Sequence, residues 1–210
     1  MSNKPRRRRK NNKTQNSGNR NQKEIGSKSA KVYAIDSAIS LKRGVQSGGY
    51  KFGELFLGFE NVDAVRRVFG PETKAILSEL KVEVFPKDGF MGVSDEDGHI
   101  FASQTYLNEG DLHSIYLDVV HELVHVKQFM DGRELFDRSY AYVDRPTEIE
   151  AYRIAADEGR RIGMSEQEVF EYLKVPWISD EEHARLALAC NISKQVLGDL
   201  VRAAQSKGIK

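Results

Sequence analysis

Short apolar segments in the first half of the chain predict β-structure. The segment "KVEVFP" (81–86) places an apolar residue at every second position, which is the period of a half-buried strand. Further along, "GFMGVS" and "HIFASQTYL" flank "DEDG", and its Asp97-Gly98 pair is a typical turn sequence. We therefore expect a β-hairpin, because "DEDG" lacks the further ligands of a calcium-binding loop.

Helical periodicity replaces this alternation in the second half of the chain. One helix is expected over about 111–130 and another over about 146–163. A few strands followed by helices indicate the α+β class. The other predicted helices are 61–70 (N-cap Asn61), 71–80 (Pro71 in the first turn), 164–173 (capping box Ser165 and Glu168), 178–190 (capping box Ser179 and Glu182) and 193–204.

Charge divides the chain into a basic tail and an acidic remainder. Residues 1–28 hold ten Lys/Arg and one acidic residue, a net charge of +9, whereas the remaining residues have a net charge of −8. The tail has almost no apolar side chains, so we expect it to be disordered. It could bind nucleic acid or another polyanion through phosphate contacts, or it could act only as a solubilising tail.

Length and composition suggest a single main domain with a helical extension. We expect a domain over 29–163 and an extension over 164–210 that packs on it. The sequence has neither an apolar run of ~20 residues nor a secretory signal, so we expect no membrane association. The single Cys190 favours a reducing, cytoplasmic compartment, and "PRRRRK" would direct the chain to a nucleus if the host has one.

The predicted helix over 111–130 has two different faces. His121 and His125 lie on one side of a helical wheel drawn at ~100° per residue, with Glu122 at its edge. We expect these imidazoles to point away from the core, into solvent or a cleft. A wide apolar stripe on the other side is expected to face the core: Leu112, Ile115, Tyr116, Val119, Leu123, Val126 and Met130.

The sequence "HELVH" (121–125) has the spacing of a zinc hydrolase motif. Histidines at i and i+4 are one turn apart, so both can bind one ion at ~2.0–2.1 Å. Glu122 follows the first histidine directly; it cannot join them as a ligand without strain, but it can take a proton from the metal-activated water. Because the motif fixes only three positions, the alternative is a solvent-exposed helix face that carries two histidines by chance.

A catalytic zinc ion needs a third protein ligand. Glu148 lies at the head of a small, apolar helix face, where a carboxylate requires a partner. Glu150 lies on the charged face of the same helix, and we expect it to form a capping box with Thr147 as N-cap. Glu148 is therefore the preferred ligand, with Glu150 and Asp131 as alternatives; a helix dipole or an Arg would be its partner if no metal binds. The other residues on the Glu148 face are Ala151, Tyr152, Ala155, Gly159 and Ile162.

"HELVH", followed 23 residues after His125 by "EIEA", resembles the gluzincin branch of the zincin metallopeptidases and is similar to the small ImmA/IrrE-like group. The resemblance covers roughly residues 80–160. It implies a small zincin-like domain with a short mixed sheet, in which His121, His125 and Glu148 bind Zn²⁺ and Glu122 is the general base.

The same resemblance implies how a substrate would bind. The hairpin strand that contains Ala102, Ser103 and Gln104 would be the edge of the sheet, where an extended peptide could add as a further strand. Two departures from the family motif, Asp118 and Lys127, replace residues that are usually uncharged or apolar. A third, Tyr152, stands where related families often have an Asp or Asn that contacts a ligand histidine.

The implied function is a zinc metallopeptidase that hydrolyses a protein or peptide substrate. Tyr140, Tyr142 and Tyr152 are candidate donors to the oxyanion because they are close to Glu148 in sequence, although each could equally be a structural aromatic residue. One alternative is an inactive zincin-like binding module whose basic tail engages nucleic acid. Another is a structural metal site, which would need a fourth protein ligand.

Four other residues are predicted to lie outside the site. We expect His183 to be exposed on its helix and Trp177 to anchor a helix connection in the core. His99 falls in the hairpin, and His113 lies far from the histidine pair on the wheel.

Overall fold

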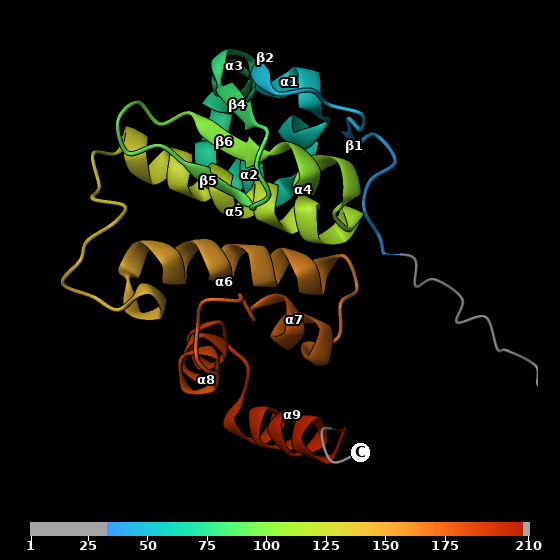
Figure 1. The fold of residues 1–210 in the computed structure, drawn as a ribbon, viewed down its shortest axis with the longest axis vertical. Helices are drawn as coiled ribbons and strands as arrows, with labels where there is room; N and C mark the ends of the chain where they lie inside the picture. The colour runs from blue at the N-terminus through green and yellow to red at the C-terminus, as the bar shows by residue number, and fades with distance from the viewer. Residues whose placement is uncertain (1–32, 208–210) are drawn as a thin grey trace, which may run out of the picture. The chain divides into compact units, whose positions relative to one another are not determined.

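The computed structural model describes residues 33–207, which form an α+β fold (Figure 1). The predicted basic tail over 1–28 lies outside the described residues. In chain order, the strands and helices are β1 (Ser40–Leu41), β2 (Gly48–Lys51), α1 (Phe52–Leu55), β3 (Phe56–Leu57), η1 (Phe59–Asn61), α2 (Asp63–Phe69), η2 (Gly70–Glu72), α3 (Thr73–Glu79), β4 (Lys81–Phe85), β5 (Met91–Val93), β6 (Ile100–Ser103), α4 (Gln104–Glu109), α5 (Leu112–Met130), η3 (Tyr142–Asp144), α6 (Pro146–Arg161), α7 (Glu166–Tyr172), α8 (Asp180–Ala189) and α9 (Lys194–Lys207).

The larger sheet has the strand order β2-β4-β6-β5 and is mixed. The predicted hairpin is confirmed: β5 and β6 pair antiparallel with Val93 opposite Ile100, and Gly98 adopts the left-handed conformation in the turn between them. β4 pairs parallel to β6 and antiparallel to β2. The strand after the turn ends sooner than expected, because the Ser103 hydroxyl accepts a hydrogen bond from the Tyr106 amide at 3.2 Å and starts α4.

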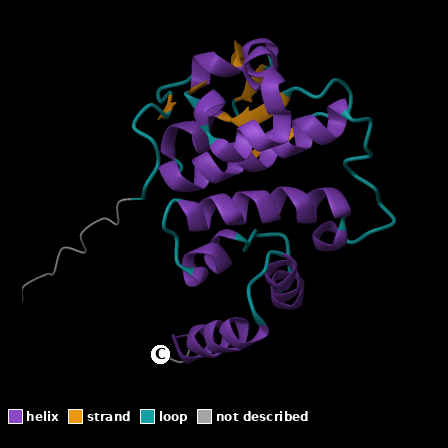
Figure 2. Ribbon diagram, turned by 180° about the vertical axis from the view of Figure 1, so that it is seen from behind, coloured by secondary structure: helices purple, strands orange, loops and turns teal. Residues whose placement is uncertain are grey.

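Helix α5 lies between the sheet and α6 (Figures 1 and 2). Its ends agree with the predicted helix over 111–130, and the Asp111 side chain caps it by accepting hydrogen bonds from the amides of His113 and Ser114. The apolar stripe packs into the core under the sheet, apart from the exposed Leu112 and Met130 at the two ends. α6 covers the opposite face, so α5 is buried on both sides.

A second hydrophobic core lies on the far side of α6. Both Ser-x-x-Glu capping boxes predicted for α7 and α8 are confirmed. The expectation for His183 is wrong: it is only 5% exposed, stacks on Phe170 and contacts the Phe170 carbonyl at 2.7 Å. The buried members of this core are Val143, Tyr152, Ala156, Val169, Leu173, Ile178, Leu186, Ala187, Cys190, Ile192 and Leu197.

Trp177 also differs from its prediction. Its side chain is 54% exposed, whereas the neighbouring Ile178 of this α7–α8 connector is buried in the core. An amphipathic Trp ring in a short connector can lie across the surface while a smaller aliphatic neighbour fills the core.

Two predicted N-caps are wrong. Asn61 belongs to the short η1 helix, and α2 begins two residues later. Thr147 is not the N-cap of α6, because the helix already begins at Pro146, a residue that suits the first helical position. The Thr147 hydroxyl instead donates to the Leu135 carbonyl at 3.1 Å.

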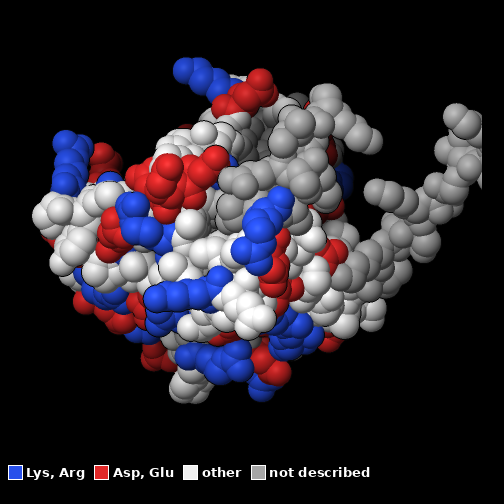
Figure 3. Space-filling view, turned by 90° about the horizontal axis from the view of Figure 1, so that it is seen from below, with Lys and Arg blue, Asp and Glu red and all other residues white. Residues whose placement is uncertain are grey.

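Among residues 33–207, no helix is both long enough and apolar enough to cross a membrane. On the face shown in Figure 3, Lys and Arg side chains are interspersed with Asp and Glu side chains. This face therefore carries no large patch of a single charge among the residues described.

Candidate metal centre

Helices α5 and α6 bring three potential metal ligands together. His121 and His125 come from adjacent turns of α5, and Glu148 comes from the first turn of α6. These three side chains form a group that could hold a metal ion. Their exposed fractions are only 4–6%, so they do not point into open solvent as one reading of the wheel allowed.

The three potential ligand atoms are spaced as a single ion requires. The two Nε2 atoms are 3.0 Å apart, and each lies 3.5 Å from Oε2 of Glu148. Ligand atoms at ~2.0–2.1 Å from a tetrahedrally coordinated ion lie about 3.3–3.4 Å apart. Apart from these two imidazoles, the Glu148 oxygen has no polar partner among the residues described, so its lone pairs are available to an ion.

Protons partly neutralise this group when no metal is bound. Burial alone would lower the pKa of His125, but the Glu148 and Glu122 carboxylates outweigh it and raise the pKa to about 9. Burial would raise the pKa of Glu148, but its contacts with both histidines hold it at about 2. Burial is also the main reason why the pKa of His121 is lowered. These shifts favour the ionised form of Glu148 and the protonated form of His125.

Glu122 lies beside the three ligands without belonging to their group. It is 7% exposed, and burial, together with the nearby Glu148 and Asp118 carboxylates, raises its pKa to about 8. A carboxyl group with such a pKa can exchange a proton near neutral pH.

Gln128 fixes the orientation of His125. Its Oε1 lies 2.7 Å from His125 Nδ1, so it accepts a hydrogen bond from the N–H at this position and leaves Nε2 to face the other candidate ligands. Its Nε2 donates to the Thr147 carbonyl at 3.0 Å and to the Glu150 carboxylate at 2.9 Å. One buried side chain thus links the histidine helix to the beginning of α6.

His121 lacks an equivalent partner. Its Nδ1 is buried without a hydrogen bond, and its ring packs against Tyr152 with centroids 4.3 Å apart. The Tyr152 hydroxyl contacts the Tyr142 hydroxyl at 2.8 Å and does not reach His121. Burial and nearby carboxylates raise the pKa of both tyrosines, so both hydroxyls stay protonated and can donate.

Asp118 is buried and held by tyrosine side chains. It lies one helical turn before Glu122, and the Tyr106 hydroxyl donates a hydrogen bond to it. Burial raises the pKa of Asp118 to about 6, although this hydrogen bond acts in the opposite direction. The buried Tyr172 hydroxyl also interacts with Asp118 and, like Tyr106, favours its ionised form.

Three sequence candidates lie outside the ligand group. Glu150 pairs with Arg133 and accepts a hydrogen bond from Gln128, and Asp131 pairs with Lys127 at the end of α5. Glu150 is thus held by side-chain contacts and not by the predicted capping box. Tyr140 is exposed to solvent.

The prediction of a substrate edge strand at Ala102, Ser103 and Gln104 is wrong. Strand β6 pairs on both sides, with β4 and with β5, and Gln104 is the first residue of α4. The edge strand of the described sheet on this side is β5, the strand that comes first in the hairpin sequence. A peptide could therefore add to β5 but not to β6.

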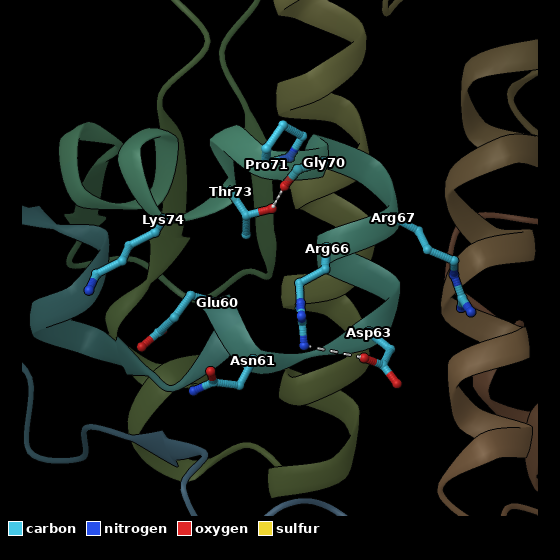
Figure 4. A pocket seen from close by; sticks show the side chains of 9 residues that line it. All are labelled: Glu60, Asn61, Asp63, Arg66, Arg67, Gly70, Pro71, Thr73 and Lys74. Atoms are coloured by element: carbon cyan, nitrogen blue, oxygen red, sulfur yellow. Dashed lines mark hydrogen bonds and ion pairs between the residues drawn. The ribbon is translucent and has the colours of Figure 1, made fainter.

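A surface cleft shown in Figure 4 shares no lining residue with this ligand group. Its volume is about 770 Å³, and it lies over α2, η2 and the start of α3 (Figure 4). Asp63 pairs with Arg66 at 3.7 Å within it, and the Thr73 hydroxyl donates to the Gly70 carbonyl. Arg67 points away from the other labelled residues, toward α6 (Figure 4). These contacts are internal to the cleft and provide no buried ligand set.

Comparison with known proteins found no relative of this chain. No family model, curated protein or solved structure matches it.

Proposed function

We propose that the protein is a zinc-dependent peptidase. The observation that carries this proposal is the 3.0, 3.5 and 3.5 Å triangle of ligand atoms, with Glu122 directly beside it. Two histidines and one carboxylate that leave the remaining position open are typical of catalytic zinc. A structural site would require a fourth protein ligand, and the group found among the described residues has three.

The chain supplies the groups that peptide hydrolysis needs. When bound, zinc would polarise the scissile carbonyl and lower the pKa of a water molecule towards about 7. Glu122 would accept the proton of the attacking water and later donate it to the leaving amine. The Tyr142 hydroxyl, buried in a region that also contains the Glu122 and Glu148 charges, is our candidate donor to the oxyanion.

The arrangement of elements is in keeping with a zincin-like fold. A small mixed sheet precedes the helix with "HELVH", and the helix with Glu148 packs against it. We propose that an extended substrate adds to the outer strand β5, whose backbone continues the sheet beside α5.

An inactive metal-binding module is the second candidate. The near-complete burial of the ligands and the unpartnered Nδ1 of His121 favour it. Polyanion binding by residues 1–28 and a cytoplasmic location remain predictions. Loss of salt-sensitive nucleic-acid binding on removal of residues 1–28 would support the prediction of polyanion binding.

Metal analysis of the wild type beside Glu148→Ala and Glu150→Ala tests the ligand assignment. We expect zinc in the wild type and in the Glu150 variant, and loss of zinc from the Glu148 variant. The opposite result for the two variants would refute the assignment, and iron in place of zinc would change the proposed chemistry, because iron uses a similar donor set.

Casein digestion with Glu122→Gln as control then tests catalysis. The substitution keeps the size of the side chain but removes its ability to accept a proton. We expect cleavage by the zinc-loaded wild type and not by this variant. Equal activity of the two proteins, or no cleavage by either, would favour the binding module.

A further inference from the structure

Four aromatic side chains from separate segments of the chain form a continuous row. We call Tyr106, Phe90, Trp177 and Tyr142 the aromatic arch. Their successive ring centroids are 5.6, 5.6 and 5.8 Å apart, with the tilted, edge-to-face geometry that aromatic pairs prefer.

The arch joins two parts of the fold that have separate hydrophobic cores. Phe90 precedes β5 on the sheet side, whereas Trp177 lies in the connector between α7 and α8. The loops that carry them lie on the sheet side of α5 and on the far side of α6, respectively (Figure 1). The Phe90–Trp177 pair therefore spans the two helices that hold the metal ligands.

Both ends of the arch are linked by side-chain contacts to α5, the helix that carries His121 and Glu122. Burial is the largest cause of the raised pKa of Tyr106 and Tyr142, and the Glu122 charge is a further cause for both. Tyr106 also donates a hydrogen bond to Asp118, one turn before Glu122 on α5. Tyr142 leads through Tyr152 to the His121 ring.

Exposure falls from the middle of the arch towards the ligands. Phe90 is 46% and Trp177 54% exposed, Tyr106 and Tyr142 are partly buried, and His121 is 5% exposed. The Phe90–Trp177 pair is thus the most solvent-exposed contact in a row of rings that leads inward to the ligand helix. We propose that this pair is a gate that must separate before substrate or metal reaches the site, an inference that rests on the proposed metal centre.

Trp177 is the mobile half of the gate. The Phe90 carbonyl accepts a hydrogen bond from the Ser103 amide at 2.8 Å, which ties Phe90 to the sheet. Trp177 lies in a short connector whose anchoring contacts come from its neighbours: Ile178 is buried, and its carbonyl accepts a hydrogen bond from Lys174 at 3.3 Å. The Trp177 ring can therefore swing away while the connector stays in place.

Zinc exchange provides a test that does not depend on peptidase activity. We would measure zinc uptake and zinc transfer to the chelator 4-(2-pyridylazo)resorcinol in wild type, Trp177→Ala, Phe90→Ala and Phe136→Ala. Phe136 is a matched control, because it is 40% exposed and lies outside the arch. Since the two gate rings are about half exposed, their removal should leave the fold intact, which circular dichroism would check.

A gate changes both rates and leaves the equilibrium unchanged. We expect uptake and release to accelerate together by about two- to tenfold in the Trp177 and Phe90 variants, the factor that corresponds to one aromatic pair. The Kd for zinc should stay constant, and the Phe136 variant should behave as wild type. Unchanged rates, or faster release without faster uptake, would overturn the gate.

Chemical modification of the metal-free protein separates this inference from the proposed function. Diethyl pyrocarbonate should modify His121 and His125 faster in Trp177→Ala than in wild type, while the partly exposed His99 and His113 react equally in both. If the protein did not bind zinc, the proposed function would be refuted. The rates of histidine modification would still show whether the Phe90–Trp177 pair limits access to the site. Equal modification of His121 and His125 in both proteins would refute the gate.

Discussion

Replacement of Gln128 by Met should weaken zinc binding without unfolding the protein. Met has a similar length and removes both hydrogen-bonding functions of the amide. The 2.7 Å contact to His125 Nδ1 would be lost, so this ring could adopt the other tautomer or rotate away from the ligand position. Loss of a partner of this kind typically lowers metal affinity about 10–100-fold, or about 1.4–2.7 kcal/mol.

The same substitution should also lower the stability of the metal-free protein. The Thr147 carbonyl, which accepts from Gln128 at 3.0 Å, would lose a buried donor at a cost of about 1–3 kcal/mol. The free-energy cost of losing the Gln128 donor would be smaller at Glu150, because this side chain is partly exposed and keeps its ion pair with Arg133. Glu150→Gln is therefore a control that alters the outer contact of Gln128 and should change zinc affinity less than threefold, about 0.6 kcal/mol.

Chelator competition at fixed pH would give the zinc Kd of wild type, Gln128→Met and Glu150→Gln, and thermal unfolding would show that each is folded. Cobalt substitution adds a spectroscopic measure of the ligand geometry. A folded Gln128→Met protein with wild-type affinity and an unchanged cobalt spectrum would show that this side chain does not orient His125.

Three further measurements follow from the site. Zinc affinity should rise about tenfold per pH unit up to about pH 9, because the ion must displace the proton that raises the pKa of His125 in the metal-free protein; a pH-independent Kd in competition titrations would contradict this. Glu122→Gln should stabilise the metal-free protein at pH 7 by up to about 3 kcal/mol: the folded-state pKa of about 8 lies above the unfolded value of 4.5, so wild-type stability is lost as pH rises between them. This gain in denaturant midpoint should vanish below about pH 4.5, and a gain that persists there has another cause. Tyr142→Phe should lower kcat about 10²–10³-fold if its hydroxyl stabilises the oxyanion, whereas Tyr140→Phe should have no effect; equal rates would remove Tyr142 from the mechanism.

The sequence predicts those parts of this fold that depend on local periodicity. The ends of α5 and α6, the Asp97-Gly98 hairpin and the two Ser-x-x-Glu boxes need only neighbouring residues to be recognised. Glu148 could be chosen over Glu150 for a similar reason. The helical repeat places the two carboxylates on different faces, and only one of these faces is apolar.

The features that were predicted wrongly depend on which strands pair and which helices pack together in three dimensions. A hairpin sequence does not state which of its strands also pairs with a third strand, so the edge position of β5 could not be separated from that of β6. A helical wheel likewise shows which face of a helix is apolar and which is polar, but it does not show which element packs over the polar face. His183 and the histidine pair are buried because α7 and α6, respectively, pack over them.

Gln128 shows why the contacts around a site are harder to predict than its ligands. "HELVH" is recognisable because metal geometry fixes the spacing of the two histidines on one helix. The Gln128 amide joins His125, Thr147 and Glu150, and two of these residues belong to another helix. Nothing in the local sequence requires a glutamine there; the requirement arises only when α6 packs against α5. The local pattern of each helix thus indicates its candidate ligands, whereas the contact that orients His125 arises only from the packing of the two helices against each other.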